Sequence, residues 1–234
     1  MTSPGARPRI PAAAFAVVVA GVSAALHLGK LPPAVPALQA SLGIGLVEAG
    51  FLLSLVQVAS MTLGLLAGLA ADTIGLRRSM LGGLAVLTLA SLAGGAVGSH
   101  LPPEQAVPWL LVLRAVEGIG FLLAVMPGPG LIRALTPAGA DKAALGLWGA
   151  YMPFGVALAL LLGPVLIGWN GWPGWWWALS LVSALAAAWL TALSFAVYSA
   201  QWMAVIGFLP AIYAGAGVPA GWNAVLTALA AAMN

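Results

Sequence analysis

The last ionisable side chain among the acids, bases and histidines of this sequence is Lys142, and residues 143–234 contain no Asp, Glu, Lys, Arg or His. A stretch of this length cannot cover a globular domain in water, because soluble domains carry about 25% charged residues. The whole chain agrees with this, since 62% of its residues are hydrophobic and 6% are charged. The sequence therefore predicts an integral membrane protein.

The same composition argues against several other classes of function. The chain has no cysteine, which excludes disulfides and thiolate chemistry. His27 and His100 lie far apart in the sequence, so we expect no metal site and no cofactor. The net charge is +3, but the bases form no cluster beside aromatic residues, and we expect no nucleic-acid partner. The sequence shows no nucleophile–base pair and no pair of carboxylates of the kind that enzymes use, so we do not expect an enzyme.

The apolar runs are continuous rather than alternating, which predicts membrane-spanning helices and argues against a barrel. Eight helices are expected, at residues 12–31, 47–71, 79–97, 108–135, 143–167, 175–193, 198–214 and 222–234. The first is expected to end near Pro32 and Pro33, and the chain to reverse its direction near residues 193–195. The last helix is shorter than the roughly 20 residues that a crossing needs.

The distribution of the basic residues predicts the orientation in the membrane. With a cytoplasmic N-terminus, six of the eight bases fall inside, namely Arg7, Arg9, Arg77, Arg78, Arg133 and Lys142. We therefore expect a multi-pass protein of the cell (inner) membrane, with residues 1–11 as a cytoplasmic tail rather than part of a cleaved signal peptide. The Trp-rich segment 169–177 is then expected at the outer interface, where indole rings are favoured.

A cluster of charges and glycines follows the second predicted helix. It consists of Gly68, Asp72, Gly75, Arg77 and Arg78. Gly68 allows a close neighbour, and Gly75 allows a backbone conformation that is closed to other residues. Asp72 can face a helix N-terminus, and the two arginines can pair with carboxylates or lipid phosphates. The alternative is that both arginines are ordinary anchors on the inner side.

Arg114 and Glu117 lie in the interior of a predicted helix, and Lys30 lies at the end of another. Arg114 needs a partner in the membrane, and Glu117 lies three residues further along the same helix face. Two interpretations stay open: an ion pair that holds the bundle together, or an arginine that faces an anion or takes part in proton transfer. Lys30 either supplies charge to a pocket or extends to the outer interface. His27 is expected to pack between helices rather than to relay protons.

Small residues predict where helices approach one another. Gly64 pairs with Gly68 in the second helix, and Gly155 pairs with Gly163 in the fifth. Faces of this kind suit close helix contact in membranes. Pro164 is expected to bend the fifth helix.

The segment Gly68–Arg78 resembles the loop motif of the major facilitator superfamily of secondary transporters, including its position between the second and third helices. Arg114–Gly120 is similar to the second motif of that family, and Gly163–Gly168 matches the third only in part. The resemblance implies a twelve-helix fold in two halves. It also implies that Asp72, Arg77 and Arg78 form a cytoplasmic gate latch, with Asp72 facing a helix of the second half.

Three further segments, Leu147–Gly155, Tyr198–Trp202 and Gly207–Pro210, resemble the cyanate and nitroimidazole porter branch of this family. This resemblance implies a small anionic or polar solute. The residues expected along its pathway, or along that of protons, are Lys30, Arg114, Glu117, Tyr151, Tyr198, Gln201 and Trp202. Symport and antiport stay undecided.

We therefore expect an all-α membrane bundle, with a six-helix N-terminal half at residues 12–193 and the start of a second half at residues 194–234. The chain looks truncated after the start of the eighth helix. The expected function is secondary active transport of a small solute by alternating access, with proton coupling left open. The alternative is a non-transporting membrane scaffold or a truncated transporter remnant.

Overall fold

The computed structural model describes residues 10–137 and 140–232. Helices make up nearly all of these described residues, and no strand occurs among them, so the predicted all-α fold is confirmed. The chain divides into two compact units, Met1–Leu190 and Thr191–Asn234. Each unit is described by itself below.

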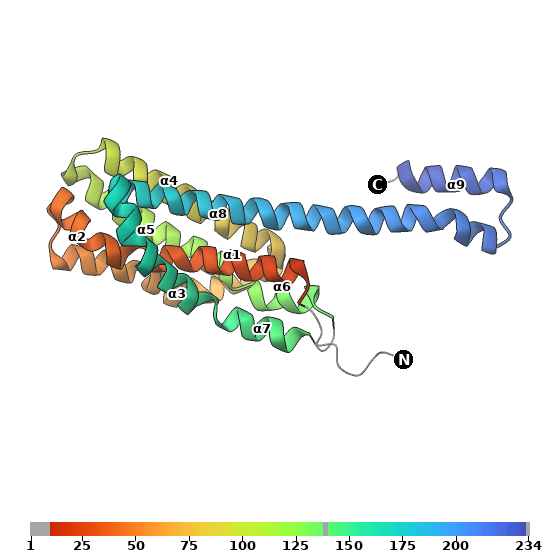
Figure 1. The fold of residues 1–234 in the computed structure, drawn as a ribbon, viewed down its shortest axis with the longest axis horizontal. Helices are drawn as coiled ribbons and strands as arrows, with labels where there is room; N and C mark the ends of the chain where they lie inside the picture. The colour runs from red at the N-terminus through yellow and green to blue at the C-terminus, as the bar shows by residue number, and fades with distance from the viewer. Residues whose placement is uncertain (1–9, 138–139, 233–234) are drawn as a thin grey trace. The chain divides into compact units, whose positions relative to one another are not determined.

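The first unit contains seven labelled helices and the first part of an eighth (Figure 1). Their bounds are α1 Ala12–Gly29, α2 Leu31–Leu42, α3 Leu46–Ile74, α4 Leu76–His100, α5 Pro103–Val125, α6 Gly128–Leu135, α7 Asp141–Gly149 and α8 Tyr151–Gly215. Helix α8 is broken at Gly171, whose φ of 68° lies in the left-handed region that favours glycine. Residues 151–170 and the residues from 172 onward therefore form two separate helical segments.

The sequence predicts that the first helix ends near Pro32 and Pro33. The structure places these prolines in the first turn of a second helix, α2. Helix α1 ends at Gly29, and Lys30 separates it from α2. Proline suits the first turn of a helix because the N–H that it lacks has no intrahelical acceptor there. The pair Pro32 and Pro33 thus interrupts the hydrogen bonding between two helices that together form one stretch, Ala12–Leu42, long enough to cross a membrane.

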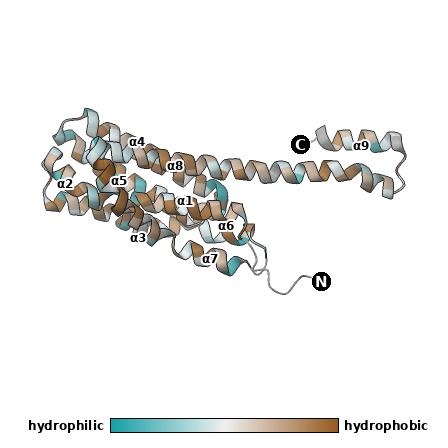
Figure 2. Cartoon of the chain, in the orientation of Figure 1, coloured by the Kyte–Doolittle hydropathy of each residue, from teal (hydrophilic) through white to brown (hydrophobic). Residues whose placement is uncertain are grey.

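Five helical stretches in the described part of the chain are long and apolar enough to span a bilayer. They are Ala12–Leu42, Leu46–Ile74, Leu76–His100, Pro103–Leu135 and Asp141–Leu193. The last has 53 residues and contains the break at Gly171, so its length suffices for two crossings. Figure 2 shows apolar residues along these helices, with hydrophilic residues more frequent towards their ends.

The second unit contains the rest of α8 and the helix α9, Ala220–Ala232. Residues 193–195 are helical, so the reversal of the chain expected there is not found. No Gly or Pro occurs between Gly174 and Gly207, and nothing in that segment interrupts helical hydrogen bonding. Helix α9 has 13 residues, which is too few to cross a membrane.

Helix α5 lies at the centre of the first unit and packs against α1, α2, α3 and α4. Two apolar clusters fill the core of this unit. One includes Val17 of α1 and Phe121 of α5, and the other includes Leu31 of α2 and Leu110 of α5. The segment of α5 between Leu110 and Phe121 therefore separates the two clusters, and it carries Arg114 and Glu117.

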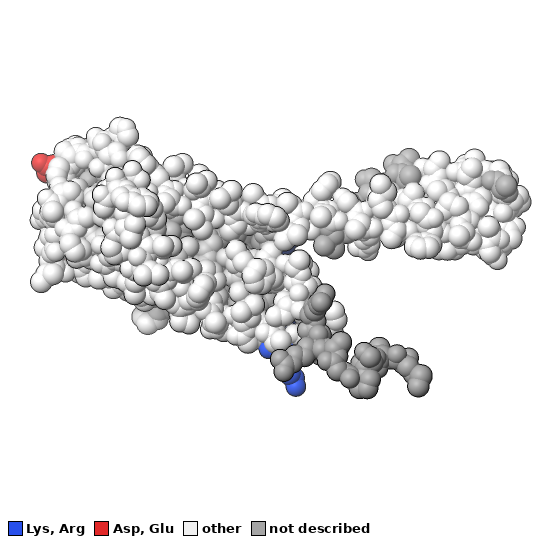
Figure 3. Space-filling model, viewed as in Figure 1, with Lys and Arg blue, Asp and Glu red and all other residues white. Residues whose placement is uncertain are grey.

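Charged atoms are scarce on the face of the first unit that Figure 3 shows. Acidic atoms are visible at one end of this unit and basic atoms at the opposite end, near the start of α7 (Figure 3). The wide white surface between them agrees with contact to lipid, since many large apolar side chains are exposed there. Which end faces the cytoplasm stays a prediction.

Candidate functional site

Three charged side chains are buried inside the first unit. The exposed fractions of Lys30, Arg114 and Glu117 are 0%, 3% and 2%, and no other Asp, Glu, Lys or Arg is buried in the described part of the chain. All three lie within stretches that are able to span a bilayer. Charges in that environment are rare and usually paired or functional, so their contacts define the candidate site.

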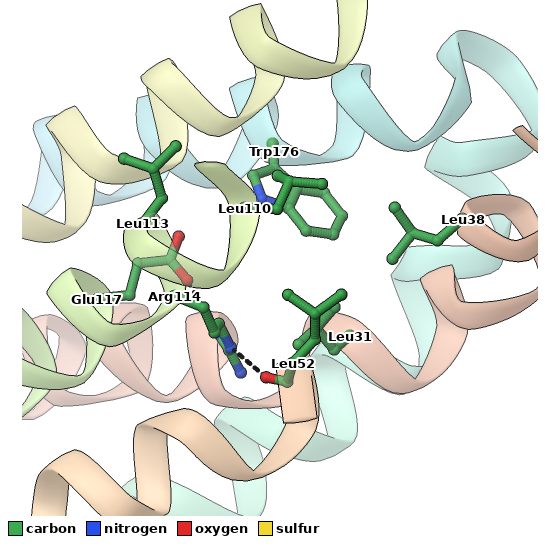
Figure 4. Close-up of a pocket in the computed structure, with 8 residues that line it drawn as sticks. All are labelled: Leu31, Leu38, Leu52, Leu110, Leu113, Arg114, Glu117 and Trp176. Atoms are coloured by element: carbon green, nitrogen blue, oxygen red, sulfur yellow. Dashed lines mark hydrogen bonds and ion pairs between the residues drawn. The ribbon is translucent and has the colours of Figure 1, made fainter. Parts of the chain in front are cut away.

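Arg114 completes the junction between α1 and α2. Its Nη1 donates to the main-chain oxygen of His27 at 2.7 Å, and its Nη2 donates to that of Leu28 at 3.4 Å. Its Nε donates to the oxygen of Leu52 in α3 at 3.1 Å (Figure 4). The carbonyls of a last helical turn have no intrahelical donors, and they form the negative end of the helix dipole. The guanidinium therefore occupies a place where a cation and several donors are both favourable.

Glu117 binds both buried cations with its two oxygens. Oε2 accepts a hydrogen bond from Nη1 of Arg114 at 2.8 Å, as the spacing along α5 predicts. Oε1 forms an ion pair with Nζ of Lys30, from the junction of α1 and α2. The three groups sum to one excess positive charge if His27 is neutral. The sequence places Arg114 and Glu117 on one helix face but does not predict that Lys30 joins them.

Lys30 has two further contacts beyond Glu117. Its Nζ donates to Oγ of Ser91 in α4 at 3.2 Å and lies 4.6 Å from the centre of the Trp176 ring in α8. A cation over an indole face is attracted by the negative charge of the π-system. Lys30 does not extend to the membrane surface, because its side chain is fully buried. The interpretation of Lys30 as a snorkelling residue is therefore wrong for this structure.

The partners of Lys30 are themselves held in place. Ser91 donates from Oγ to the main-chain oxygen of Trp176 at 2.8 Å, and Nε1 of Trp175 donates to the oxygen of Lys30 at 3.1 Å. Gly94 allows the indole of Trp176 to approach α4, since a Cβ at that position would lie 2.6 Å from Cδ1 of the ring. Helices α4 and α8 thus form the wall against which Lys30 packs.

The sequence predicts that the tryptophans of segment 169–177 face the outer membrane interface. The structure shows this segment to be divided between exposed and buried rings. Trp169 and Trp177 are exposed, but Trp172, Trp175 and Trp176 are buried. The prediction of an interfacial belt is therefore wrong for these three residues. Trp172 and Trp176 are buried because Gly98 and Gly94 of α4 leave room for their rings. Trp175 is held instead by its hydrogen bond to the main-chain oxygen of Lys30.

His27 lies next to this group and joins α1 to α8. Oγ of Ser183 donates to the oxygen of Leu179 at 2.8 Å, so Nε2 of His27 is the donor in its contact with that hydroxyl. Nδ1 of His27 is buried and has no hydrogen-bond partner among the described residues. The same is true of Oγ of Ser23, four residues earlier on the same face of α1.

A small cavity lies beside the charged residues (Figure 4). It is lined by five leucines, the two charged residues of α5 and an indole, namely Leu31, Leu38, Leu52, Leu110, Leu113, Arg114, Glu117 and Trp176. Its volume is about 10 Å³, which is near the minimum for one water molecule. The structure therefore shows the site closed around its own side chains.

The gate-motif residues lie where α3 ends and α4 begins. Gly75 has a φ of 97°, a conformation that residues with side chains rarely adopt. Asp72, Arg77 and Arg78 are exposed, and none forms an ion pair among the described residues. Asp72 lies in the last turn of α3 and the two arginines in the first turn of α4, so each charge faces the unfavourable end of its own helix dipole. Their charges do not serve helix stability, and the predicted latch stays a prediction.

Tyr151 does not line the cavity at Arg114 and Glu117. It stacks on Trp148, with ring centres 4.3 Å apart, and it lines a separate apolar groove between α1, α7 and α8. Gln201 and Trp202 belong to the second unit, and the side chain of Tyr198 lies outside the described residues. The predicted roles of these four residues in the solute pathway stay predictions.

The four glycine positions predicted to pack closely differ in their surroundings. A Cβ at Gly155 would lie 2.5 Å from Cβ of Ala25, and one at Gly163 would lie 2.6 Å from Cγ of Pro33. At Gly64 no atom of the structure lies within 4 Å of such a Cβ, and at Gly68 only Cε of Met126 does, at 3.9 Å. Gly155 and Gly163, beside Pro164, therefore bring α8 against α1 and α2. No group of three His, Asp or Glu that could hold a metal occurs in the described ranges.

Comparison with known proteins addresses the family directly. The sequence profile of the Major Facilitator Superfamily matches residues 13–200. The chain belongs to this superfamily. Its many apolar helices and its multi-pass membrane character follow from that membership.

Two curated relatives illustrate the range of this superfamily. The puromycin resistance protein pur8 of Streptomyces alboniger is 33% identical over 141 residues, which is 59% of this chain and 26% of that protein. Solute carrier family 2, facilitated glucose transporter member 10, of Homo sapiens is 25% identical over 189 residues, or 79% of this chain and 34% of that protein. The match thus covers about a third or less of the length of each of these relatives.

Proposed function

We propose that this superfamily member moves a small anionic or polar solute across the cell (inner) membrane by alternating access, with its N-terminus in the cytoplasm. The proposal concerns a transporter and not an enzyme. It includes the resemblance to the cyanate and nitroimidazole porter branch, which rests on sequence segments alone. One relative is named as a facilitated glucose transporter, which favours transport, and the other as a puromycin resistance protein, so the two names select no common solute.

The observation that carries the proposal is the group of two cations and one carboxylate inside the bundle. A structural ion pair needs equal charges, whereas this group holds one excess positive charge. An excess charge in a low-dielectric interior is unfavourable by several kcal/mol, and the main-chain oxygens at the end of α1 reduce this penalty only for Arg114. A site that is completed by a negatively charged or strongly polar solute removes that penalty. The solute would enter beside this group when the bundle opens, displacing the side chains that line the small cavity.

Glu117 is the candidate proton carrier of this mechanism. It is the acid that faces both Lys30 and Arg114, with His27 as the neighbouring titratable group. Protonation of Glu117 would release Lys30 and leave two buried cations, which favours the entry of an anion. Coupling between proton and solute movement then follows from the competition for the same cations.

Uptake into liposomes tests this proposal. The protein expressed from its complete reading frame is reconstituted, and uptake of labelled small anions and heterocycles is measured with and without an imposed pH gradient. The same assay is run on Glu117→Gln and on Glu104→Gln, which changes an exposed acid at the start of the same helix. We expect the pH dependence to be lost only in Glu117→Gln. Unchanged pH dependence in that variant would rule out its role as proton carrier, and no uptake of any solute would contradict transport.

A further inference from the structure

Arg114 and Lys30 carry the same charge but are held by different kinds of atoms. Three of the four acceptors of Arg114 are main-chain oxygens, those of His27, Leu28 and Leu52. These oxygens cannot rotate away from the guanidinium unless the helices themselves move. Arg114 is therefore fixed by the fold and has little freedom to follow a ligand.

Proline explains why one of these oxygens, that of Leu28, needs a donor from another helix. In an uninterrupted helix the N–H of residue 32 would donate to the oxygen of Leu28, but Pro32 has no N–H. The break between α1 and α2 thus leaves acceptors inside the membrane-spanning region, where an unsatisfied carbonyl is costly. Arg114 supplies a donor to the oxygen of Leu28 from α5, and a second to that of His27 in the same last turn of α1. Its first role is to complete the junction of α1 and α2.

Lys30, in contrast, contacts only side chains with its ammonium group. Its partners are Glu117, Ser91 and the ring of Trp176. Glu117 keeps its hydrogen bond from Arg114 if Lys30 moves, and Ser91 keeps its own bond to the oxygen of Trp176. The lysine side chain has four rotatable bonds, so its ammonium can shift without moving a helix. Lys30 can therefore leave while Glu117 and Ser91 each keep one hydrogen bond.

The charge of the site limits the ligand. Lys30, Arg114 and Glu117 leave one positive charge in excess, so a monoanion makes the group neutral while a dianion reverses its sign. The cavity beside the group has a volume of only about 10 Å³, so the ligand enters by displacing side chains rather than by filling a void. Trp176 and the leucines that line the cavity present a planar, apolar wall to the body of the ligand.

We propose that Lys30 is the cation that binds the solute, that Arg114 is a positioning residue, and that the solute is a small monoanion whose body packs against Trp176. The ammonium group of Lys30 leaves Glu117 and binds the anion, while Glu117 keeps its hydrogen bond from Arg114. This inference rests on the proposed transport function and names its substrate class. It also assigns Trp176 and Ser91 to the site.

Ligand-induced stabilisation tests the inference on the purified protein. Sodium benzoate, sodium nitrate and sodium sulfate are titrated at equal ionic strength, while the melting temperature and the tryptophan fluorescence are recorded. A ligand that binds the folded state raises the melting temperature with its concentration. We expect saturable shifts with benzoate and nitrate and none with sulfate. Equal stabilisation by sulfate, or no shift with either monoanion, would overturn the inference.

Two variants separate the roles of the cations. Lys30→Met is expected to weaken benzoate binding by about tenfold or more, the loss typical of one charged hydrogen bond. Lys142→Met removes an exposed lysine and is expected to bind like the unchanged protein. Retained affinity in Lys30→Met would overturn the inference. The preference for monoanions over sulfate in the unchanged protein tests the proposed solute class even if Lys30→Met does not fold, and its absence would overturn the inference.

The uptake assay distinguishes this inference from the function on which it rests. Uptake of a solute by both the unchanged protein and Lys30→Met would leave transport standing and overturn the assignment of Lys30. Monoanion binding that depends on Lys30, without uptake of any solute into liposomes, would support the binding site and contradict transport.

Discussion

Lys30 and Glu117 lie 87 positions apart in the sequence and form an ion pair in the interior of the bundle. The pair joins the junction of α1 and α2 to α5. Both side chains are buried, with exposed fractions of 0% and 2%. The second oxygen of Glu117 binds Arg114 at 2.8 Å. One carboxylate therefore binds two cations from different parts of the bundle and leaves one positive charge in excess.

Replacement of Glu117 by Gln is expected to destabilise the folded protein strongly. The variant leaves Lys30 and Arg114 buried without an anion, and breaking one side of a buried ion pair typically reduces the free energy of unfolding by about 3–5 kcal/mol. Denaturant unfolding in detergent, followed by tryptophan fluorescence, measures the change. Glu104→Gln on the same helix is the control, because Glu104 is exposed in the first turn, and we expect its unfolding free energy to fall by no more than about 1 kcal/mol through the helix dipole. Equal effects of both variants would contradict the buried pairing.

Only part of the buried charged group can be predicted from the sequence. Arg114 and Glu117 are three residues apart, so helix geometry alone predicts that they share a face. Lys30 joins them only because α1 breaks after Gly29, and Ser91 and Trp176 join because α4 and α8 pack at Gly94. Contacts between helices far apart in the sequence have no local signal. The closely spaced glycines of α4 were the available indication that large rings pack there.

The helices of the fold are likewise easier to predict from the sequence than the points where they end. Continuous apolar runs predict the membrane-spanning helices well, because the need to satisfy the backbone in lipid leaves few alternatives. The prolines at 32 and 33 were a weaker guide, since proline both ends helices and begins them. At residues 193–195 the expected turn rested on the length of the apolar run alone, and the segment contains no Gly or Pro that would break a helix.

Gly83 is expected to be one of the least replaceable glycines in the protein. A Cβ at this position would lie 2.6 Å from the main-chain oxygen of Gly120 and 2.7 Å from the carbonyl carbon of Leu123, and main-chain atoms cannot move aside. We expect Gly83→Ala to lower the free energy of unfolding by about 1–3 kcal/mol. The neighbouring Gly82 has no atom within 4 Å of such a Cβ, so Gly82→Ala is expected to raise it by about 0.5–1 kcal/mol through helix propensity. Effects of equal sign would contradict the close approach of α4 and α5.

Asp72→Asn separates a role in gating from a role in stability. Asp72 is exposed, has no ion-pair partner in the described ranges and lies at the unfavourable end of α3, so the variant is expected to keep or slightly raise the free energy of unfolding, by about 0.3–1 kcal/mol. If the predicted latch exists, the same variant slows solute uptake into liposomes. A loss of stability together with unchanged uptake would contradict both parts.

The control for Asp72 is an acid at the opposite end of a helix. Asp141 lies in the first turn of α7, where the helix dipole favours a negative charge. Asp141→Asn is therefore expected to lower the free energy of unfolding by about 0.3–1 kcal/mol, which is the opposite sign, and to leave uptake unchanged. Thermal unfolding and liposome uptake, measured side by side for the two variants, give the comparison.

Accessibility of a single introduced cysteine tests alternating access at this site most directly, and residues 1–234 contain no other cysteine that would react. Leu113 lines the cavity, whereas Val112, its neighbour on α5, is 53% exposed on the apolar surface. In sealed liposomes, we predict that Leu113→Cys reacts with a membrane-impermeant thiol reagent from both sides, and that benzoate changes the two rates in opposite directions. Val112→Cys is expected to react from neither side. Reaction of Leu113→Cys from one side only, whatever solute is present, would contradict a transport site between Lys30, Arg114 and Glu117.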